Sequence, residues 1–440
     1  MTETKFRYRT VTAVVIANMI GTGVFTSLGF QLLDITSGFV ILMLWAVGGL
    51  IAVCGAMTYA ELGAAMPRSG GEYNFLTRIY HPAAGFVSGW ISATVGFAGP
   101  SALAAMTFAA YTSSVFGTEY GEWFEKALAI GLVIVLTILH GGSRASSGSV
   151  QMVFTILKVI VIVLFCLLAI WLVNTPQPVT FMPDAGDGDL ITSSAFAVSL
   201  IYVSYAYTGW NAATYLSSEL EDPQRTLPVI LLTGTLIVTI LYVTLNYTFL
   251  LAAPIDAMRG EVEIGFITAQ AAFGDIGGNF TGLVLAFLLI STVSAMTLAG
   301  PRVLQVIGED FTAVNFLAKT NDDGIPSRAI YVQSALSILF ILSSTFESIL
   351  VFAGFTLALN SFATVLGVFV LRYRQPDLPR PYRTFLYPLT PLIYLGLTGW
   401  TLWFVLLNRP VEGLFGIGII GSGLAIYFLS RLRTPEKSES

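Results

Sequence analysis

Two short glycine-containing segments interrupt apolar runs that are otherwise long enough to cross a membrane. The first is Ile20-Gly21-Thr22-Gly23-Val24-Phe25, and the second is Tyr205-Ala206-Tyr207-Thr208-Gly209-Trp210-Asn211. Glycine permits non-helical backbone, and unpaired backbone groups at membrane depth are tolerated only where they are buried in protein or line a cavity. Close helix packing explains one such segment alone, but a pair in corresponding parts of the chain favours a ligand-binding site.

A helix that breaks at these places exposes two kinds of backbone group. The half that begins near Thr22 would present free amides and the positive end of its dipole, and the half before it would end in the carbonyls of Met19 and Ile20. Amides suit an anion and carbonyls suit an ammonium group. Because neither segment contains a charged side chain, the pattern favours a ligand that carries both charges itself, a free α-amino acid.

Lys158 is a basic residue deep inside an apolar run, about nine residues, or ~13 Å, from its start. A lysine near the middle of a membrane costs roughly 2.5–3.5 kcal/mol, so we expect it to face the interior of the bundle. Snorkelling to an interface is the alternative. Its acceptors would be the carbonyls at the first interruption and the hydroxyl of Ser291 or Thr292. The ammonium would then take the place of a sodium ion, and transport would not need sodium.

Glu61 is an acid at the end of another apolar run. We expect it to form an ion pair with a residue such as Arg302 that closes an inner gate, and proton carriage is the alternative. His81 and His140 are expected to pack at membrane interfaces rather than to relay protons. The apolar runs contain no metal-ligand cluster, nucleophile–base pair or phosphate loop, so we expect no enzyme activity, no metal and no cofactor.

The elements that must position these residues are membrane-spanning helices. Of the 440 residues, 55% are hydrophobic and only 11% are charged, against roughly 25% charged in soluble domains. Since one span takes roughly 20 apolar residues, the apolar runs predict an all-α membrane protein with twelve transmembrane helices. Their ranges are 11–33, 38–65, 83–115, 126–140, 149–173, 190–217, 226–252, 279–301, 328–345, 348–371, 384–408 and 411–430.

The positions of the basic residues orient these helices. With the N-terminus inside, the cytoplasmic segments hold 17 Lys and Arg residues and the external segments hold 3. The positive-inside rule therefore predicts a multi-pass protein of the cell inner (plasma) membrane, surrounded by the lipid bilayer, with both termini in the cytoplasm. The net charge of −5 gives no reason to expect a nucleic-acid partner.

Taken together and in order, these residues resemble the amino acid–polyamine–organocation (APC) superfamily. The similarity is greatest to the L-type amino acid transporter family, as a prokaryotic light-chain-like member. It rests on residues 20–25, Tyr59-Ala60-Glu61-Leu62, Pro67-Arg68-Ser69-Gly70-Gly71-Glu72-Tyr73, Lys158, and the stretches 207–211 and 219–223. The resemblance implies a single domain of the LeuT type with broken helices 1 and 6. Residues 11–173 and 190–371 would form two inverted five-helix repeats, and 384–430 the last two spans.

The resemblance also implies a central site between spans 1, 3, 6, 8 and 10. The amides of Thr22 and Gly23 would hold the substrate carboxylate. The substrate amine would be held by the carbonyls of Met19, Ile20, Tyr205 and Thr208. Tyr205 would close over the substrate, Trp210 would pack near the pocket, and Lys158 would link span 5 to the break in span 1. Depth alone places Gly96 and Phe97 of span 3, and Phe355 and Asn360 of span 10, near this site.

Two departures from the family pattern bear on substrate and partner. Thr208 stands where relatives have Gly, Ser or Asp, and with no charge in the second interruption this suggests neutral substrates with small to medium side chains. The loop 117–126 lacks the cysteine by which animal relatives join a glycoprotein subunit. No covalent heavy-chain subunit is therefore expected.

These features predict sodium-independent transport of neutral L-amino acids, by exchange and alternating access. Proton-coupled uptake is the first alternative and requires Lys158 or Glu61 to change protonation during the cycle. A non-transporting amino-acid sensor is the second alternative. A sensor would normally carry an output domain, whereas residues 431–440 form a short tail.

Overall fold

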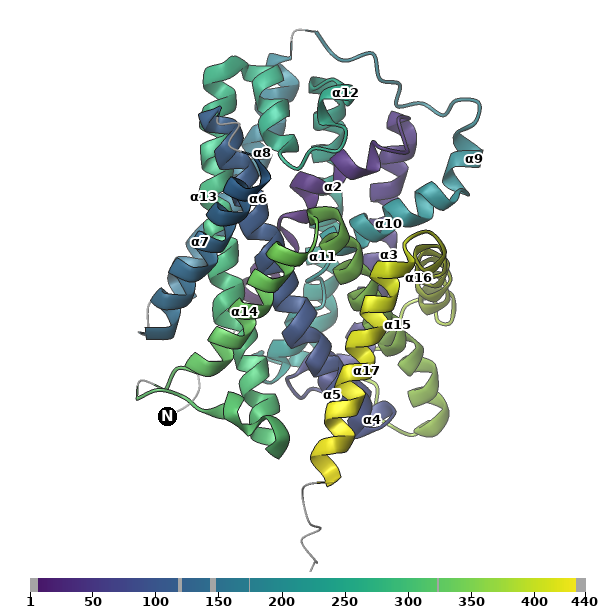
Figure 1. Ribbon diagram of the computed structural model, residues 1–440. Helices are drawn as coiled ribbons and strands as arrows, with labels where there is room; N and C mark the ends of the chain where they lie inside the picture. The colour runs from purple at the N-terminus through teal and green to yellow at the C-terminus, as the bar shows by residue number, and fades with distance from the viewer. Residues whose placement is uncertain (1–6, 118–120, 143–147, 174, 323, 433–440) are drawn as a thin grey trace, which may run out of the picture.

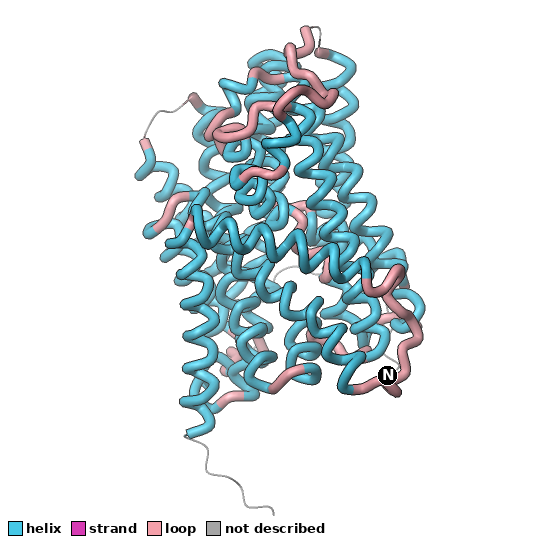
Figure 2. The backbone as a smooth tube through the Cα atoms, turned by 90° about the vertical axis from the view of Figure 1, so that its right-hand side faces the viewer, coloured by secondary structure: helices cyan, strands magenta, loops and turns pink. Residues whose placement is uncertain are grey.

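The computed structural model describes residues 7–432 except 118–120, 143–147, 174 and 323. Every regular element in these ranges is a helix (Figures 1 and 2). In chain order they are α1 (Tyr8–Met19), α2 (Gly23–Gln31), α3 (Gly38–Ala65), α4 (Gly71–Ile79), α5 (Pro82–Ile91), η1 (Ser92–Phe97), α6 (Ala98–Phe116), α7 (Glu122–Gly142), α8 (Gly148–Leu172), α9 (Asp187–Ile191), α10 (Ser194–Ala206), η2 (Ala212–Glu219), α11 (Pro223–Ala252), α12 (Ile255–Met258), α13 (Ile264–Asp310), η3 (Thr312–Ala318), α14 (Ser327–Ser343), α15 (Phe346–Arg374), α16 (Leu389–Asn408) and α17 (Pro410–Leu432).

Twelve apolar helical stretches match the twelve predicted spans. Within the described ranges, nine are long and apolar enough to cross a membrane, and three shorter ones are Ile156–Leu172, Ser194–Ala206 and Ser327–Ser343. The prediction of an all-α, multi-pass membrane protein is thereby confirmed. Helix α4 and the C-terminal end of α17 lie at one end of the bundle, and α9 and α12 lie at the other (Figure 1). The division into two inverted repeats stays a prediction.

One span is preceded by a short helix that its apolar run did not indicate. The run at 279–301 belongs to α13, which extends from Ile264 to Asp310 and bends at Gly274, where φ is 72°. The flanking acids Glu263 and Asp275 conceal the first turns of this helix in the sequence. Positive φ is a conformation that glycine adopts readily, so Gly274 forms a kink between two helices, 264–273 and 275–310.

Two spans are broken at the predicted interruptions. Helix α1 ends at Met19, and α2 begins four residues later at Gly23. Helix α10 ends at Ala206, and η2 continues from Ala212 after Gly209 has taken φ 97°. Helices α3 and α11 pack against each other. Helix α11 also packs against α1 and η2, one part of each broken span, and α3 packs against α10 and η2.

Candidate functional site

The two breaks lie directly against each other. A Cβ atom added to Gly23 would lie 2.7 Å from the Cα atom of Ala206, at the end of α10. A Cβ atom added to Gly209 would lie 2.7 Å from the carbonyl carbon of Asn18, at the end of α1. Real Cβ atoms do not approach other atoms so closely, so glycine at each break is required for the contact with the other.

The N-terminal end of α2 offers backbone donors at this meeting point. Thr22 occupies the N-cap position and makes no side-chain cap, although its carbonyl accepts a hydrogen bond from the Phe25 amide at 3.0 Å. The first amides of a helix have no partner within it, and the helix dipole makes them favourable for a negative charge. The amides near Thr22 and Gly23 therefore suit a carboxylate.

The carbonyls that were expected to be free are engaged. The Met19 carbonyl accepts hydrogen bonds from the Gly21 amide at 2.8 Å and from the Tyr242 hydroxyl at 2.5 Å. The Tyr205 carbonyl accepts bonds from the Thr208 amide at 3.0 Å and from the Thr208 hydroxyl at 2.7 Å. A carbonyl oxygen has two lone pairs, so both acceptors are saturated, and the expectation of a free Met19 carbonyl is wrong for this structure.

Tyr242 is a site residue that the sequence reasoning missed. It lies in α11, is fully buried, and its hydroxyl is also 3.1 Å from the Ala206 carbonyl. One side chain thus ties the ends of α1 and α10 together. The signal was present, because a tyrosine hydroxyl inside an apolar run needs a buried partner, but the sequence does not show which partner it finds.

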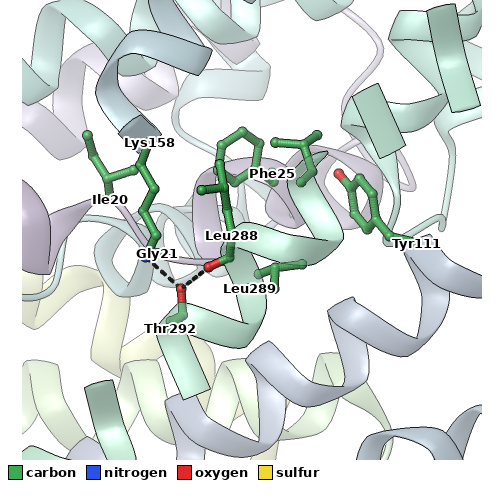
Figure 3. Close-up of a pocket in the computed structure, with 9 residues that line it drawn as sticks. Ile20, Gly21, Phe25, Tyr111, Lys158, Leu288, Leu289 and Thr292 are labelled. Carbon is green, nitrogen blue, oxygen red and sulfur yellow. Dashed lines mark hydrogen bonds between the residues drawn. The ribbon is translucent and has the colours of Figure 1, made fainter. Parts of the chain in front are cut away.

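Lys158 reaches the first break from α8. Its Nζ atom donates a hydrogen bond to the Thr292 hydroxyl at 2.7 Å, and Thr292 in turn donates to the Leu288 carbonyl at 3.3 Å. Figure 3 shows the Lys158 side chain running beside Ile20 and Gly21 toward Thr292. Within the described ranges, Ser291 Oγ is buried without a hydrogen-bond partner, so Thr292 is the hydroxyl that Lys158 uses.

A small cavity adjoins this lysine. Its volume is about 20 Å³, which is enough for roughly one water molecule. Apart from Lys158 and Thr292 it is lined by apolar or aromatic groups and by the backbone of the break. The lining residues are Ile20, Gly21, Phe25, Tyr111, Lys158, Leu285, Leu288, Leu289 and Thr292.

A second and more polar cavity adjoins the break in span 6. Its volume is about 40 Å³, space for roughly three water molecules. Thr208 and Trp210 line it, together with residues of α3, α15 and α16. The complete lining is Gly48, Ile51, Ala52, Ser204, Tyr207, Thr208, Trp210, Gly354, Leu357, Ala358, Ser361, Tyr394 and Thr398.

Tyr205 lies in an aromatic cluster between α2, α10 and α15. It is 4% exposed and belongs to the same apolar cluster as Phe30, Tyr202 and Phe346. The rings of Phe30 and Phe346 stack with their centroids 5.7 Å apart. Phe30 belongs to α2 and Phe346 to α15, and the closing role expected of Tyr205 stays a prediction.

The ion pair of Glu61 differs from the predicted one. Arg372 donates two hydrogen bonds to its carboxylate, at 2.8 and 2.7 Å, and Arg380 lies 3.5 Å away. The Thr384 amide and hydroxyl each donate to the same carboxylate at 2.7 Å. Arg302 is exposed on α13 and is not among the partners of Glu61, so the predicted pair is wrong. Arg372 lies in the last turn of α15, and sequence alone does not select it among several arginines.

Depth alone also misplaced the residues of spans 3 and 10. Gly96 and Phe97 lie in the π-helical turn η1 and line neither cavity. Phe355 is buried in the apolar cluster around Tyr205, and Asn360 donates a hydrogen bond to Glu72. Their neighbours Gly354, Leu357, Ala358 and Ser361 line the second cavity instead, since helix rotation, which depth does not determine, decides which face meets a cavity.

Comparison with known proteins decides the family. A family model described as "Amino acid permease" matches residues 6–426. The chain belongs to this amino acid permease family. The permease is therefore an amino acid transporter, and the predicted similarity to the L-type transporters of the APC superfamily is confirmed.

Three relatives cover nearly the whole permease. It is 29% identical over 441 residues to the human large neutral amino acids transporter small subunit 2, covering 94% of this chain and 78% of the relative. It is 25% identical over 425 residues to the mouse b(0,+)-type amino acid transporter 1, covering 94% and 85%. It is 27% identical over 425 residues to the mouse Asc-type amino acid transporter 1, covering 94% and 79%.

Proposed function

We propose that the permease exchanges neutral L-amino acids across the plasma membrane by alternating access, without sodium, and with both termini in the cytoplasm. The observation that carries the proposal is the position of Lys158 beside the first break, bonded to Thr292 at 2.7 Å. A fixed ammonium at this place makes a bound metal cation unnecessary. The basic residues of the predicted inner segments support the orientation.

The substrate would lie across the two breaks. Its carboxylate would accept hydrogen bonds from the amides of Thr22 and Gly23, at the positive end of α2. Its ammonium would bind the carbonyls of Ile20 and Thr208, and those of Met19 and Tyr205 once their present donors release them. Such a site recognises the two charges that all zwitterionic amino acids share.

The substrate side chain would enter the second cavity. Thr208 and Trp210 form part of its wall, and none of the described residues that line it carries a charge. A volume of about 40 Å³ favours a small neutral side chain, and Tyr205 would close the site from the side of α2. The large neutral, Asc-type and b(0,+)-type names of the relatives agree with a substrate of the α-amino acid class.

Glu61 would act as a gate rather than as a proton carrier. Its carboxylate is 1% exposed and is held by Arg372, Arg380 and Thr384. A carboxylate paired with arginine is stabilised in its charged form, which opposes protonation during the cycle. The pair joins α3 to the end of α15 and would have to separate when that side of the protein opens.

The permease would work without a covalently attached subunit. The two cysteines, Cys54 and Cys166, are buried in helices, and the loop 117–126 contains none. Residues 118–120 of that loop lie outside the described residues, so this proposal rests on the sequence.

Counterflow in proteoliposomes tests the proposed function. Vesicles at equal internal and external pH, without sodium, would be loaded with one unlabelled amino acid and offered a panel of labelled neutral, cationic and acidic ones. We expect labelled neutral amino acids to accumulate only when the vesicles contain amino acid. Equally fast efflux without external amino acid would contradict exchange. Uptake into empty vesicles driven by a pH gradient would favour proton coupling, and binding without flux would favour a sensor.

A further inference from the structure

Glu72 is a buried carboxylate at the start of α4 that has no role in the site described above. Its side chain is 4% exposed, and it accepts five hydrogen bonds from side chains. Oε1 accepts from Tyr59, Asn211 and Ser361 at 2.5, 3.2 and 3.0 Å, and Oε2 accepts from Tyr215 and Asn360 at 3.2 and 2.8 Å.

All five donors are neutral. Among the described residues, no lysine, arginine or histidine forms an ion pair with Glu72. Burying a charge without an opposite charge is costly, and burial raises the pKa of the Glu72 carboxyl above its usual value. The carboxylate is therefore held by hydrogen bonds from neutral donors.

The donors come from three separate elements. Tyr59 belongs to α3, Asn211 and Tyr215 belong to the segment that follows the break in span 6, and Asn360 and Ser361 belong to α15. Glu72 thus connects one end of a broken span to two continuous helices. Removing the carboxylate would remove the acceptor that all three elements share.

Two glycines before Glu72 let the start of α4 approach the segment that follows the break in span 6. Gly70 has φ 117° and Gly71 has φ 52°, conformations that glycine adopts at little cost. A Cβ atom added to Gly71 would lie 2.9 Å from the ring of Tyr215. The two glycines therefore allow α4 to begin against the segment after the break, with Glu72 directed into the cluster of donors.

The same cluster forms one wall of the second cavity. Ser361 lines that cavity and also donates to Glu72. The ring of Tyr59 packs edge-on against Trp210, another lining residue, with 4.6 Å between the centroids. Helix α4, whose second residue is Glu72, lies at the end of the bundle where α17 ends (Figure 1).

We propose that Glu72 is a positioning residue whose ionised carboxylate holds the segment after the span 6 break against α3 and α15, and that this clasp opens when substrate leaves toward the α4 end. When this side of the protein opens, water can replace each neutral side chain that donates a hydrogen bond to Glu72. The Glu72 carboxylate then regains the hydration that it lost on burial. The clasp is therefore reversible. This inference rests on the alternating-access mechanism proposed above.

Thiol accessibility tests the clasp. In a background with Cys54→Ala and Cys166→Ala, the substitution Ala358→Cys places a reporter thiol in the second cavity. We then add Glu72→Gln, whose amide nitrogen cannot accept hydrogen bonds and deprives at least two of the five donors of their acceptor. A water-soluble thiol reagent should label the reporter thiol about tenfold faster, the change that ~1.4 kcal/mol makes in an equilibrium. Glu72→Asp, which keeps the charge, should give a smaller increase.

Three controls separate the clasp from general loosening. Glu309→Gln changes an exposed glutamate and should leave the labelling rate unchanged. Val293→Cys places a thiol in the buried core between α6, α7 and α13, and its labelling should not increase with Glu72→Gln. If the glutamine variant fails to fold, Tyr215→Phe removes one donor hydroxyl and should accelerate labelling of the reporter thiol by a smaller factor.

Unchanged labelling of the reporter thiol in Glu72→Gln, or an equal increase at Val293→Cys, would overturn the proposal. Counterflow of the parent protein in the same vesicles reports the proposed transport separately. If the parent protein exchanges amino acids but Glu72→Gln does not change the labelling rate, the proposed role of Glu72 alone is refuted. If the parent protein shows no counterflow, the proposed exchange function is refuted.

Discussion

Replacing Tyr242 by phenylalanine removes a single hydroxyl from the point where the two broken spans meet. That hydroxyl lies 2.5 Å from the Met19 carbonyl oxygen and 3.1 Å from the Ala206 carbonyl oxygen, and the side chain is fully buried. If the substrate ammonium binds the Met19 carbonyl, then the hydroxyl and the substrate compete for one acceptor. The substitution should therefore affect the empty and the loaded permease differently.

The expected difference follows from the cost of a lost hydrogen bond. Without substrate, the variant leaves buried carbonyl groups short of a donor, and we expect its free energy of unfolding to fall by ~1–3 kcal/mol. With substrate, the ammonium supplies a donor to Met19 and restores part of this loss. Substrate should then stabilise the Tyr242→Phe variant by about 1 kcal/mol more than the parent, which corresponds to an apparent Kd about fivefold lower.

Thermal unfolding in detergent, measured over a range of amino acid concentrations, gives both quantities. Tyr80→Phe is the control, because its hydroxyl also donates to a backbone carbonyl, that of Ala363 at 2.9 Å, but it lines neither cavity and does not bond Met19. It should be destabilised equally with and without substrate. An equal substrate-induced shift in the Tyr242→Phe variant and the parent would refute the competition for Met19.

Three further substitutions test other contacts. Lys158→Met should reduce counterflow roughly tenfold or more, since a hydrogen bond from a charged group is worth ~1.5–3 kcal/mol, and restoration by added sodium would contradict the role of the fixed ammonium. Glu61→Gln should lower the free energy of unfolding by about 3 kcal/mol, the low end for a buried pair, because Arg380 and the partly exposed Arg372 lose their counter-charge, whereas Arg302→Gln should have no measurable effect. Gly209→Ala should lower the yield of folded protein, because its φ of 97° costs a non-glycine residue ~1–3 kcal/mol and its Cβ would strike Asn18.

The breaks themselves were predictable from the sequence. Gly21, Gly23 and Gly209 stand in a pair of glycine-containing segments at corresponding places in two apolar runs, and such paired interruptions indicate broken helices around a binding site. The membrane depth of Lys158 likewise limited its partners to a few hydroxyls on a neighbouring span, and Thr292 was one of the two considered. The composition of a segment and the depth of a residue in its span depend only on the order of residues, so both can be read from the sequence.

Partner choice was not predictable in the same way. Glu61 had several arginines at the same predicted membrane surface, and the one that reaches it depends on how α3 and α15 pack. The Met19 and Tyr205 carbonyls were expected to be free, yet Tyr242 and Thr208 satisfy them. Buried acceptors are rarely left without a donor, and the identity of that donor is a property of three-dimensional packing.

The buried acceptors of this protein fall into two classes, those bonded by neutral donors and those bonded by a charged donor. The Met19 carbonyl, the Tyr205 carbonyl and the Glu72 carboxylate are all bonded by neutral hydroxyl, amide or carboxamide groups. A bond between neutral groups contributes only ~0.5–1.5 kcal/mol net, and one to the ionised Glu72 carboxylate ~1.5–3 kcal/mol. A substrate ammonium can replace the donors of the two carbonyls, and entering water can replace those of Glu72. Glu61, in contrast, is fixed by arginine, and in the proposed mechanism the larger energy of substrate binding would drive its separation. Substitutions that weaken the neutral bonds should therefore change substrate affinity, and loss of the ion pair should lower the stability of the closed state most.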